Sequence, residues 1–283
     1  MNGDTRFEIG SITKVFTSLL LADMVLAGEV SLDDSVMKHL PEGALANAPH
    51  ITLRMLAAHR SGIASVPAPL IDATGMQVRD PLDPYASFNE EAFSTWLREV
   101  EPVAEPDAEF AYSNAGFALL GQALAHAAAR DFESLLMERI VRPMGLEHTD
   151  FDKQGLVDAY ANGEKTPPWH LAMIAPAGGL VSTLGDVTAF ARLLAEPDER
   201  WSNHVDMLVA DKSPAMGSAT VGLGLFQIDV GKQRFWLHNG GTGGFSTALW
   251  IEPAADRGAV VLLNSSDESA EPLALYMLRR TAP

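Results

Sequence analysis

A nearly uniform apolar stretch close to the start of the chain constrains the fold most strongly. Residues 11–27 read "SITKVFTSLLLADMVLA", and their pattern predicts one helix that ends before Gly28. Apolar side chains surround almost the whole helix and leave little polar face for water. We therefore expect the helix to be buried inside a domain. The run contains Ser18 and Asp23 and is too short to span a bilayer.

The composition describes an acidic globular protein without cysteine chemistry. The 283 residues are 47% apolar and 20% charged, with a formal net charge of −17, which suits one large domain or a domain with an insertion. This acidic balance argues against nucleic acid and anionic membranes as partners, because nothing neutralises phosphate. The absence of cysteine excludes disulfides, thiolate chemistry and cysteine-based zinc sites. The eight histidines are scattered without a metal-ligand spacing, so we predict no metal site.

The first ten residues, "MNGDTRFEIG", show no signal peptide, since they lack a basic region followed by an apolar core. As written, the chain is expected in the cytoplasm. A longer native N-terminus would make it periplasmic. No membrane span is expected.

The order of the expected elements predicts an α+β fold, in which helices flank an antiparallel sheet and a large, mainly helical insertion interrupts the body. Apolar periodicity and turn signals place further helices at 51–62, 89–100, 114–129, 185–196 and 267–280. Another begins at 132 and is ended by Pro143 and Gly145. Short β-rich runs follow one another late in the chain, at 221–230, 234–238, 245–252 and 258–265. We expect residues 1–50 and 175–283 to form the α/β body, residues 51–174 the helical region, and the active site to lie between them.

A Ser-x-x-Lys pattern occurs twice, and its surroundings separate the two copies. Ser35 and Lys38 lie in a polar stretch beside two acidic residues, where the lysine would stay solvated and protonated. Ser11 and Lys14 open the buried helix and share one face. Burial would lower the pKa of Lys14, so that it could take a proton from Ser11, and helix-start N–H groups would stabilise a developing negative charge. The alternative is that Ser11 caps the helix and Lys14 reaches for solvent.

Two further features could complete a site. Tyr112-Ser113-Asn114 lies where a turn meets an apolar helix, and a phenolate near a lysine can act as a general base; the alternative is an ordinary half-buried tyrosine. A second Tyr-x-Asn, at Tyr160, lies in a loop without rigid support. The stretch "HNGGTGGF" (238–245) has glycines that would let a substrate approach a strand closely, or it is only a glycine-rich hairpin.

In this order, Ser-x-x-Lys, Tyr-Ser-Asn and His-Asn-Gly resemble the motifs of the serine β-lactamase and penicillin-binding-protein superfamily. The nearest branch is similar to class C β-lactamases, DD-peptidases and family VIII carboxylesterases. Satellite stretches agree with it, among them "ITLRMLAAHRSGI", "PMGLEHTDF" and "PAGGLVSTLGDVTAFARLLA". The match runs over nearly the whole chain, whereas no Gly-x-Ser-x-Gly elbow, His-Glu-x-x-His or P-loop is present.

The resemblance implies a mechanism that needs no metal or cofactor, and a set of residues that carry it. Ser11 would attack a carbonyl and form an acyl-enzyme, with Lys14 and Tyr112 sharing the base role. The N–H groups of Ser11 and Gly241 would form the oxyanion hole, and water, activated by Tyr112, would release the acyl group. The predicted catalytic residues are Ser11, Lys14 and Tyr112. The predicted substrate-binding residues are Asn114, His238, Asn239, Gly240 and Gly241.

The chain departs from the family pattern in its motifs and at its start. His238 replaces the lysine of class C β-lactamases, and because histidine is mostly neutral at pH 7, carboxylate-bearing β-lactams should be poorer substrates. Pro106-Asp107 stands where Pro-Gly is usual and should alter the loop that leads to the tyrosine.

The usual N-terminal helix and first two strands do not precede Ser11. The run 258–265 would then form a long apolar sheet edge, and we expect another subunit or a rearranged segment to cover it.

Three functions follow from these residues. The first is a serine hydrolase that acts on small carboxylic esters, a carboxylesterase with weak β-lactamase side activity. The second is a D-amino-acid-directed peptidase, a DD-carboxypeptidase or a β-lactamase. The third is a catalytically inactive binding homologue. The acyl and leaving groups would depend on pocket walls built from residues 63–111 and 150–178.

Overall fold

The fold combines nine α-helices and ten strands in the part of the chain that the computed structural model describes, residues 1–45, 50–75 and 77–280. The helices are α1 (Thr13–Leu26), α2 (Leu53–Ala57), α3 (Glu90–Glu99), α4 (Asn114–Ala127), α5 (Phe132–Leu136), α6 (Ala175–Gly178), α7 (Leu184–Ala195), α8 (Ser202–Ala210) and α9 (Ala270–Arg280). Short 3-10 or π turns precede α1 and α6 and follow α5. None of the described helices is both long and apolar enough to cross a membrane.

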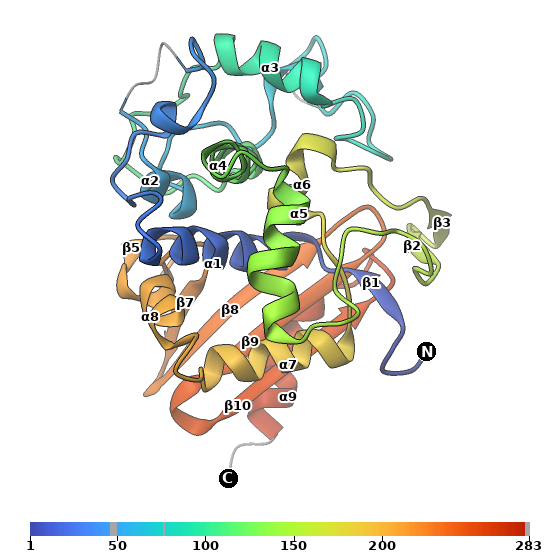
Figure 1. Ribbon diagram of the computed structural model, residues 1–283. Helices are drawn as coiled ribbons and strands as arrows, with labels where there is room; N and C mark the ends of the chain where they lie inside the picture. The colour runs from blue at the N-terminus through green and yellow to red at the C-terminus, as the bar shows by residue number, and fades with distance from the viewer. Residues whose placement is uncertain (46–49, 76, 281–283) are drawn as a thin grey trace.

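One antiparallel sheet dominates the late part of the chain, in the order β10-β9-β8-β7-β6-β5 (Figure 1). Its strands are β5 (Ser213–Pro214), β6 (Thr220–Val221), β7 (Phe226–Val230), β8 (Gln233–Gly241), β9 (Ser246–Glu252) and β10 (Arg257–Leu263). Each strand pairs with its neighbour along the chain, so the sheet is the predicted meander. Two small antiparallel pairs stand apart, β1 (Arg6–Glu8) with β4 (Val181–Thr183) and β2 (Ala159–Ala161) with β3 (Glu164–Thr166).

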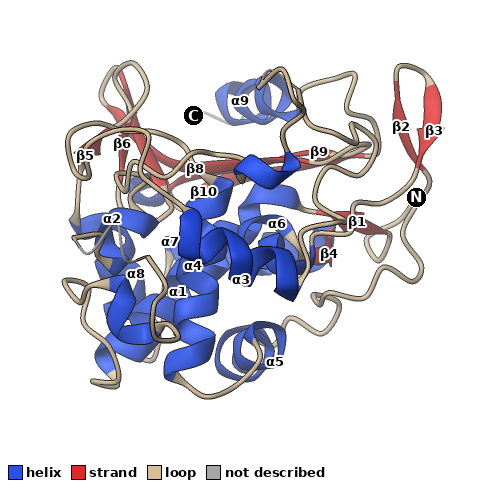
Figure 2. Cartoon of the chain, turned by 90° about the horizontal axis from the view of Figure 1, so that it is seen from above, coloured by secondary structure: helices blue, strands red, loops and turns tan. Residues whose placement is uncertain are grey.

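Helices cover both faces of the large sheet (Figure 2). Alternate residues of β9 point to opposite sides, since successive strand side chains do so. Leu249 and Ile251 join the main core, to which α1, α4 and α7 contribute. Ala248 and Trp250 instead pack with residues of α9 in a second cluster. The chain therefore forms the helix–sheet–helix layers of the predicted α+β class.

Helix α1 lies in the centre of the molecule, as its sequence predicts. Eleven of its residues are buried, because other elements pack around it: it contacts α4, α6 and α8. The stacked rings of Phe16 and Phe190, with centroids 4.0 Å apart, join it to α7. The first residues of α1 are thus held rigidly on all sides.

Several predicted boundaries were wrong. The helix expected at 51–62 ends at Ala57, because the backbone at His59 turns into the left-handed region with φ +55°. The helix expected from 132 until Pro143 is α-helical only to Leu136 and continues as a π turn and a 3-10 turn. Helix α8 and strands β1 and β4 were not predicted.

Strand β10 stands at the end of the sheet order and pairs only with β9 among the described residues. Its faces are covered by α7 and α9, and its outer edge has no strand neighbour over Arg257–Leu263 in that part of the chain. Just beyond β10, Tyr160 of β2 pairs with Ser265. The division into a body (1–50 and 175–283) and a helical region (51–174) stays a prediction, since buried residues of both join one core cluster.

Candidate active site

Ser11 and Lys14 lie together at the entrance to α1. Ser11 belongs to a 3-10 turn, Gly10–Ile12, and its side chain does not cap the helix: the N-cap residue is Ile12, without a side-chain cap. Lys14 is fully buried, so it does not reach for solvent. Its Nζ lies 3.0 Å from the Ser11 hydroxyl oxygen. The capping alternative from the sequence is therefore wrong.

Three oxygen atoms lie within hydrogen-bond distance of the Lys14 Nζ. Its Nζ donates to the Asn114 side-chain carbonyl at 2.8 Å and to the Ala177 backbone carbonyl at 2.7 Å. A neutral amine has two N–H groups and one lone pair, so these two acceptors would leave the lone pair for the Ser11 O–H. Burial lowers the pKa of Lys14 well below its ordinary value, which favours that state.

Tyr112 and Asn114 come from the start of α4. Ser113 caps this helix by accepting the Gly116 N–H at 2.8 Å, which fixes the residues on either side of it. The Lys14 Nζ lies 4.9 Å from the centre of the Tyr112 ring. Burial raises the pKa of Tyr112, a rise that a hydrogen bond with Ser11 opposes, so the phenol is protonated at neutral pH.

Strand β8 brings the third motif to the same place. Residues 238–241 belong to the strand, and only the following turn, 242–245, is the hairpin that joins β8 to β9. Gly10 has φ +51°, and a Cβ there would lie 2.7 Å from the Gly241 nitrogen. The glycines thus let the backbone of β8 pack directly against the turn that carries Ser11.

His238 is buried and uncharged. Its Nδ1 lies 2.7 Å from the Asn239 carbonyl oxygen, so Nδ1 carries the proton that this carbonyl accepts. Burial lowers the pKa of His238 to about 3. The position that is lysine in class C β-lactamases is therefore filled by a neutral ring.

Asn239 does not join the site. Its Nδ2 donates to Glu271 of α9 at 2.7 Å, because successive residues of a strand point to opposite faces. The prediction that its side chain binds substrate has no support here, and we leave it out of the proposed binding set.

The duplicate motifs lie elsewhere. Lys38 is mostly exposed and pairs with Asp34 at 3.0 Å, as its polar surroundings predict. Tyr160 lies in β2 and is also exposed. Neither duplicate contributes to the cleft above Ser11.

The cleft beside Ser11 is small and carries no charged lining residue. Its walls include Tyr85 and Trp169, whose rings meet edge to face with centroids 5.7 Å apart. Leu171, Ile174 and Thr242 also line it. Its volume of about 20 Å³ admits roughly one water-sized group, since each needs about 10–15 Å³.

The pocket walls were expected from residues 63–111 and 150–178. Tyr85, Trp169, Leu171 and Ile174 come from these stretches, but none of them was predicted individually. Tyr85 accepts a hydrogen bond from Asn114 Nδ2 at 3.0 Å, which ties the wall to the site. An aromatic residue in an irregular stretch gives no local signal of such a contact. The contact spans 29 positions of the chain.

A buried acid supports the Trp169 wall. Glu8 of β1 is 1% exposed, accepts the Trp169 backbone N–H at 3.2 Å, and pairs with Lys153 at 3.0 Å. A buried carboxylate needs such partners. Because Glu8 lies three residues before Ser11, it connects one wall of the cleft to the strand that leads to the serine.

The unusual Pro106-Asp107 pair forms a defined turn. Asp107 has φ +64°, a conformation that glycine adopts more readily, and it is held by Arg60, whose Nε lies 2.7 Å from Oδ1. The Asp107 N–H also donates to the Arg60 carbonyl at 2.7 Å. Arg60 therefore holds Asp107 in a backbone conformation that glycine would adopt more readily.

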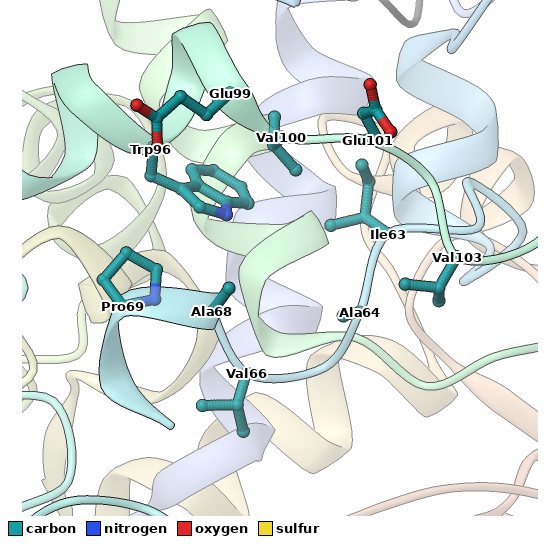
Figure 3. A pocket seen from close by; sticks show the side chains of 10 residues that line it. All are labelled: Ile63, Ala64, Val66, Ala68, Pro69, Trp96, Glu99, Val100, Glu101 and Val103. Atoms are coloured by element: carbon teal, nitrogen blue, oxygen red, sulfur yellow. The ribbon is translucent and has the colours of Figure 1, made fainter. Parts of the chain in front are cut away.

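A second cavity, of about 400 Å³, lies between the loop that begins at Ile63 and the end of α3 (Figure 3). Trp96, Val100 and Val103 line it, with Glu99 and Glu101 at its rim. It shares no lining residue with the Ser11 cleft and contains no serine, lysine, tyrosine or histidine. Nor do the described residues include three acidic or histidine side chains grouped to hold a metal. The Ser11 cleft is thus the better candidate for chemistry.

The chain resembles known proteins over its whole length. A family model described as Beta-lactamase matches residues 1–282. A Beta-lactamase-like protein of Arthroderma benhamiae is 30% identical over 214 residues, which are 66% of this chain and 35% of that protein. The D-alanyl-D-alanine-carboxypeptidase/endopeptidase AmpH of Escherichia coli is 28% identical over 288 residues, covering 93% of this chain and 72% of AmpH.

Solved structures share the fold. An octameric penicillin-binding protein homologue from Pyrococcus abyssi superposes with a TM-score of 0.82 at 26% identity, covering 98% of this chain and 66% of that one. A β-lactamase/D-alanine carboxypeptidase from Pseudomonas syringae gives a TM-score of 0.83 at 19% identity, covering 100% of this chain and 86% of that one. With a family model over nearly every residue and this common fold, the chain belongs to the β-lactamase family.

Proposed function

We propose that this protein is a serine hydrolase of small, uncharged carboxylic esters that works through an acyl-enzyme on Ser11. The observation that carries the proposal is the contact between the Ser11 hydroxyl and the fully buried Lys14 amine at 3.0 Å. A nucleophile and a base within hydrogen-bond reach, with the base oriented by a third group, is the arrangement that covalent catalysis needs. Asn114 is that third group, through its bond to Lys14.

In the proposed acylation, Lys14 takes the proton from Ser11 as the serine oxygen attacks the ester carbonyl. Tyr112 keeps its own proton at neutral pH, because burial raises its pKa. It therefore acts as a relay, giving a proton to the leaving alkoxide and regaining one from Lys14. The C–O bond to the alcohol breaks, the Ser11 ester forms, and the alcohol leaves protonated.

The same groups would serve deacylation. The N–H groups of Ser11 and Gly241 form the proposed oxyanion hole, supported by the close packing of the Gly10 turn against β8. Water attacks the Ser11 ester, and the Lys14–Tyr112 pair accepts its proton and returns one to Ser11. The products are a free acid and the regenerated serine.

The chemistry of the cleft favours neutral substrates. None of the residues that line it is Lys or Arg, and His238, with its pKa at about 3, supplies no positive charge. A substrate carboxylate, such as those of β-lactams and D-alanyl peptides, would have no cation to bind there. The aromatic walls of the cleft, Tyr85 and Trp169, favour short acyl groups.

A peptidase is the second candidate, favoured by the similarity to AmpH over 93% of this chain. It would use the same Ser11, Lys14 and Tyr112, with the Asn114 Nδ2 contacting the acyl-side amide. The inactive alternative is disfavoured, because the three proposed catalytic residues lie in contact.

A substrate panel tests these readings. Short p-nitrophenyl esters, nitrocefin and D-alanyl peptides are offered to the wild type and to Ser11→Ala. We expect the wild type to turn over acetate and propionate esters and, weakly, nitrocefin. Ser11→Ala should turn over none of these substrates. Faster cleavage of D-alanyl peptides than of esters would favour the peptidase, and no turnover or acylation at all would favour the inactive homologue.

We also propose that a second copy of the chain, or a rearranged segment, covers the outer edge of β10. The edge has no strand neighbour in the described part of the chain, and unpaired edges of this kind tend to pair. Light scattering at micromolar concentration should show an oligomer. A strictly monomeric species would contradict the second copy.

A further inference from the structure

His59 lies behind the proposed catalytic tyrosine, in a motif that the mechanism leaves unused. It is fully buried and takes the left-handed φ of +55° just after α2. Its backbone carbonyl accepts the Ala111 N–H at 2.8 Å. Its ring Nδ1 lies 3.1 Å from the Ser113 nitrogen and accepts that N–H. Backbone and side chain thus hold the chain immediately before and after Tyr112.

The ring of His59 also packs on the ring of Tyr112. The two centroids are 4.4 Å apart with an interplanar angle of 30°, and the Phe117 ring lies 4.9 Å from His59 on another side. Aromatic pairs at such distances prefer defined offset geometries. The imidazole therefore restricts the plane in which the phenol can lie.

This role requires an uncharged imidazole with its proton on Nε2. Nδ1 has no proton to give, because it accepts the Ser113 N–H. Burial lowers the pKa of His59 well below its ordinary value and keeps the ring neutral. A protonated ring would lose the acceptor that holds Ser113.

We propose that His59 is a positioning residue for the reaction: its ring orients the Tyr112 phenol, and its Nδ1 fixes the backbone between Tyr112 and Asn114. His59 touches no substrate in this account and acts through Tyr112. The size of its kinetic effect rests on the proposed hydrolase function, whereas the contact with Ser113 can be tested without any substrate.

Two substitutions separate the two contacts. Asn tolerates positive φ and offers a carbonyl oxygen near the place of Nδ1, so His59→Asn keeps the acceptor and loses the ring. His59→Phe keeps a ring and loses the acceptor. His126→Asn, at an exposed position near the end of α4, is the matched control.

We expect kcat for p-nitrophenyl acetate to fall in both variants with KM little changed, because misplacing a proton relay by an ångström can cost about 100-fold. Amide hydrogen exchange followed by mass spectrometry should show faster exchange at Ser113 in His59→Phe. In His59→Asn, protection of Ser113 should persist. His126→Asn should match the wild type in both measurements.

The proposal is overturned if His59→Phe keeps both the wild-type kcat and the wild-type exchange at Ser113. It is also overturned if both variants lose kcat only in proportion to a loss of folded protein, measured by thermal unfolding. A wild type that turns over no ester refutes the proposed function instead, and the exchange experiment still decides whether His59 holds Ser113.

Discussion

Two copies of Ser-x-x-Lys, Ser11–Lys14 and Ser35–Lys38, share a spacing but not an environment. The Lys14 amine is fully buried and bonded to Ser11, Asn114 and Ala177. The Lys38 side chain is 64% exposed and pairs with Asp34. The motif alone is therefore no guide to chemistry.

The difference between the copies is the packing around the lysine. Lys14 enters a helix covered by α4, α6 and α8, so its charged form is desolvated and its pKa falls. Ser35 and Lys38 lie around a short 3-10 turn near the surface, where water solvates the ammonium group. Only a neutral amine can take the serine proton.

The largest expected effect separates the two serines. Ser11→Ala should lower kcat/KM for p-nitrophenyl acetate by at least about 1,000-fold, because the nucleophile is lost. Ser35→Ala should leave it unchanged. Steady-state kinetics on both purified variants check the pair, and the reverse pattern would assign the reaction to the second copy.

The two lysines should differ almost as much. Lys14→Met removes the proposed base and should cost about 100- to 10,000-fold in kcat, the usual range for general-base catalysis. Lys38→Met should keep full activity and change the free energy of unfolding by no more than about 0.5 kcal/mol, since it breaks one exposed ion pair. Urea unfolding and kinetics measure both. Equal kcat in the two variants would remove Lys14 from the mechanism.

The pH dependence should report the lowered pKa of Lys14. Below that pKa the amine is protonated, so kcat/KM should fall about tenfold per pH unit. Above it the base is free, and the rate should level off far below pH 10.5, the ordinary lysine value. A rate that keeps rising up to pH 10 would mean that Lys14 is not desolvated as described.

A smaller effect on kcat is expected at Gly10, the residue before Ser11. Gly10→Ala brings a Cβ within 2.7 Å of the Gly241 nitrogen and should lower kcat by about tenfold or more, by displacing one donor of the oxyanion hole. Gly28→Ala is the control, because Gly28 has a similar positive φ but open space around its Cβ position. A kcat equally reduced in both would point to backbone strain alone.

The smallest effect concerns acyl length. Trp169→Ala enlarges the cleft and should raise the butyrate-to-acetate ratio of kcat/KM by about tenfold, in line with the effect of one or two methylenes in a pocket. Leu82→Ala, at an exposed position in the irregular stretch 63–111, should leave the ratio unchanged. An unaltered ratio in Trp169→Ala would show that this ring does not limit the acyl group.

The sequence was informative where a residue's surroundings follow from its neighbours along the chain. The burial of α1 follows from its uniform apolar pattern, and the polar residues beside Ser35 mark that copy as exposed. The meander of β7 to β10 follows from short β-rich runs separated by turn residues. These features follow from the spacing of apolar and polar residues along the chain, which can be read without knowing any distant contact.

The sequence failed where a residue's conformation is set by distant partners. The expected helix at 51–62 stops early at His59, whose Nδ1 bonds a nitrogen 54 positions away. Tyr85, Trp169 and Glu8 gather at the cleft from three separate stretches, and no local pattern marks them. Asn239 was expected to bind substrate together with His238, whereas strand β8 continues through Gly241 and the Asn239 side chain bonds Glu271 of α9.

The most direct test of Ser11 as the nucleophile is to find which residue carries the acyl group. The wild type, mixed with a short p-nitrophenyl ester, is quenched in acid during the first turnover, digested, and mapped by mass spectrometry. We predict an acyl adduct on the peptide that contains Ser11, absent from Ser11→Ala and present in Ser35→Ala. An adduct on Ser35, or on any residue outside the Ser11 cleft, would contradict it.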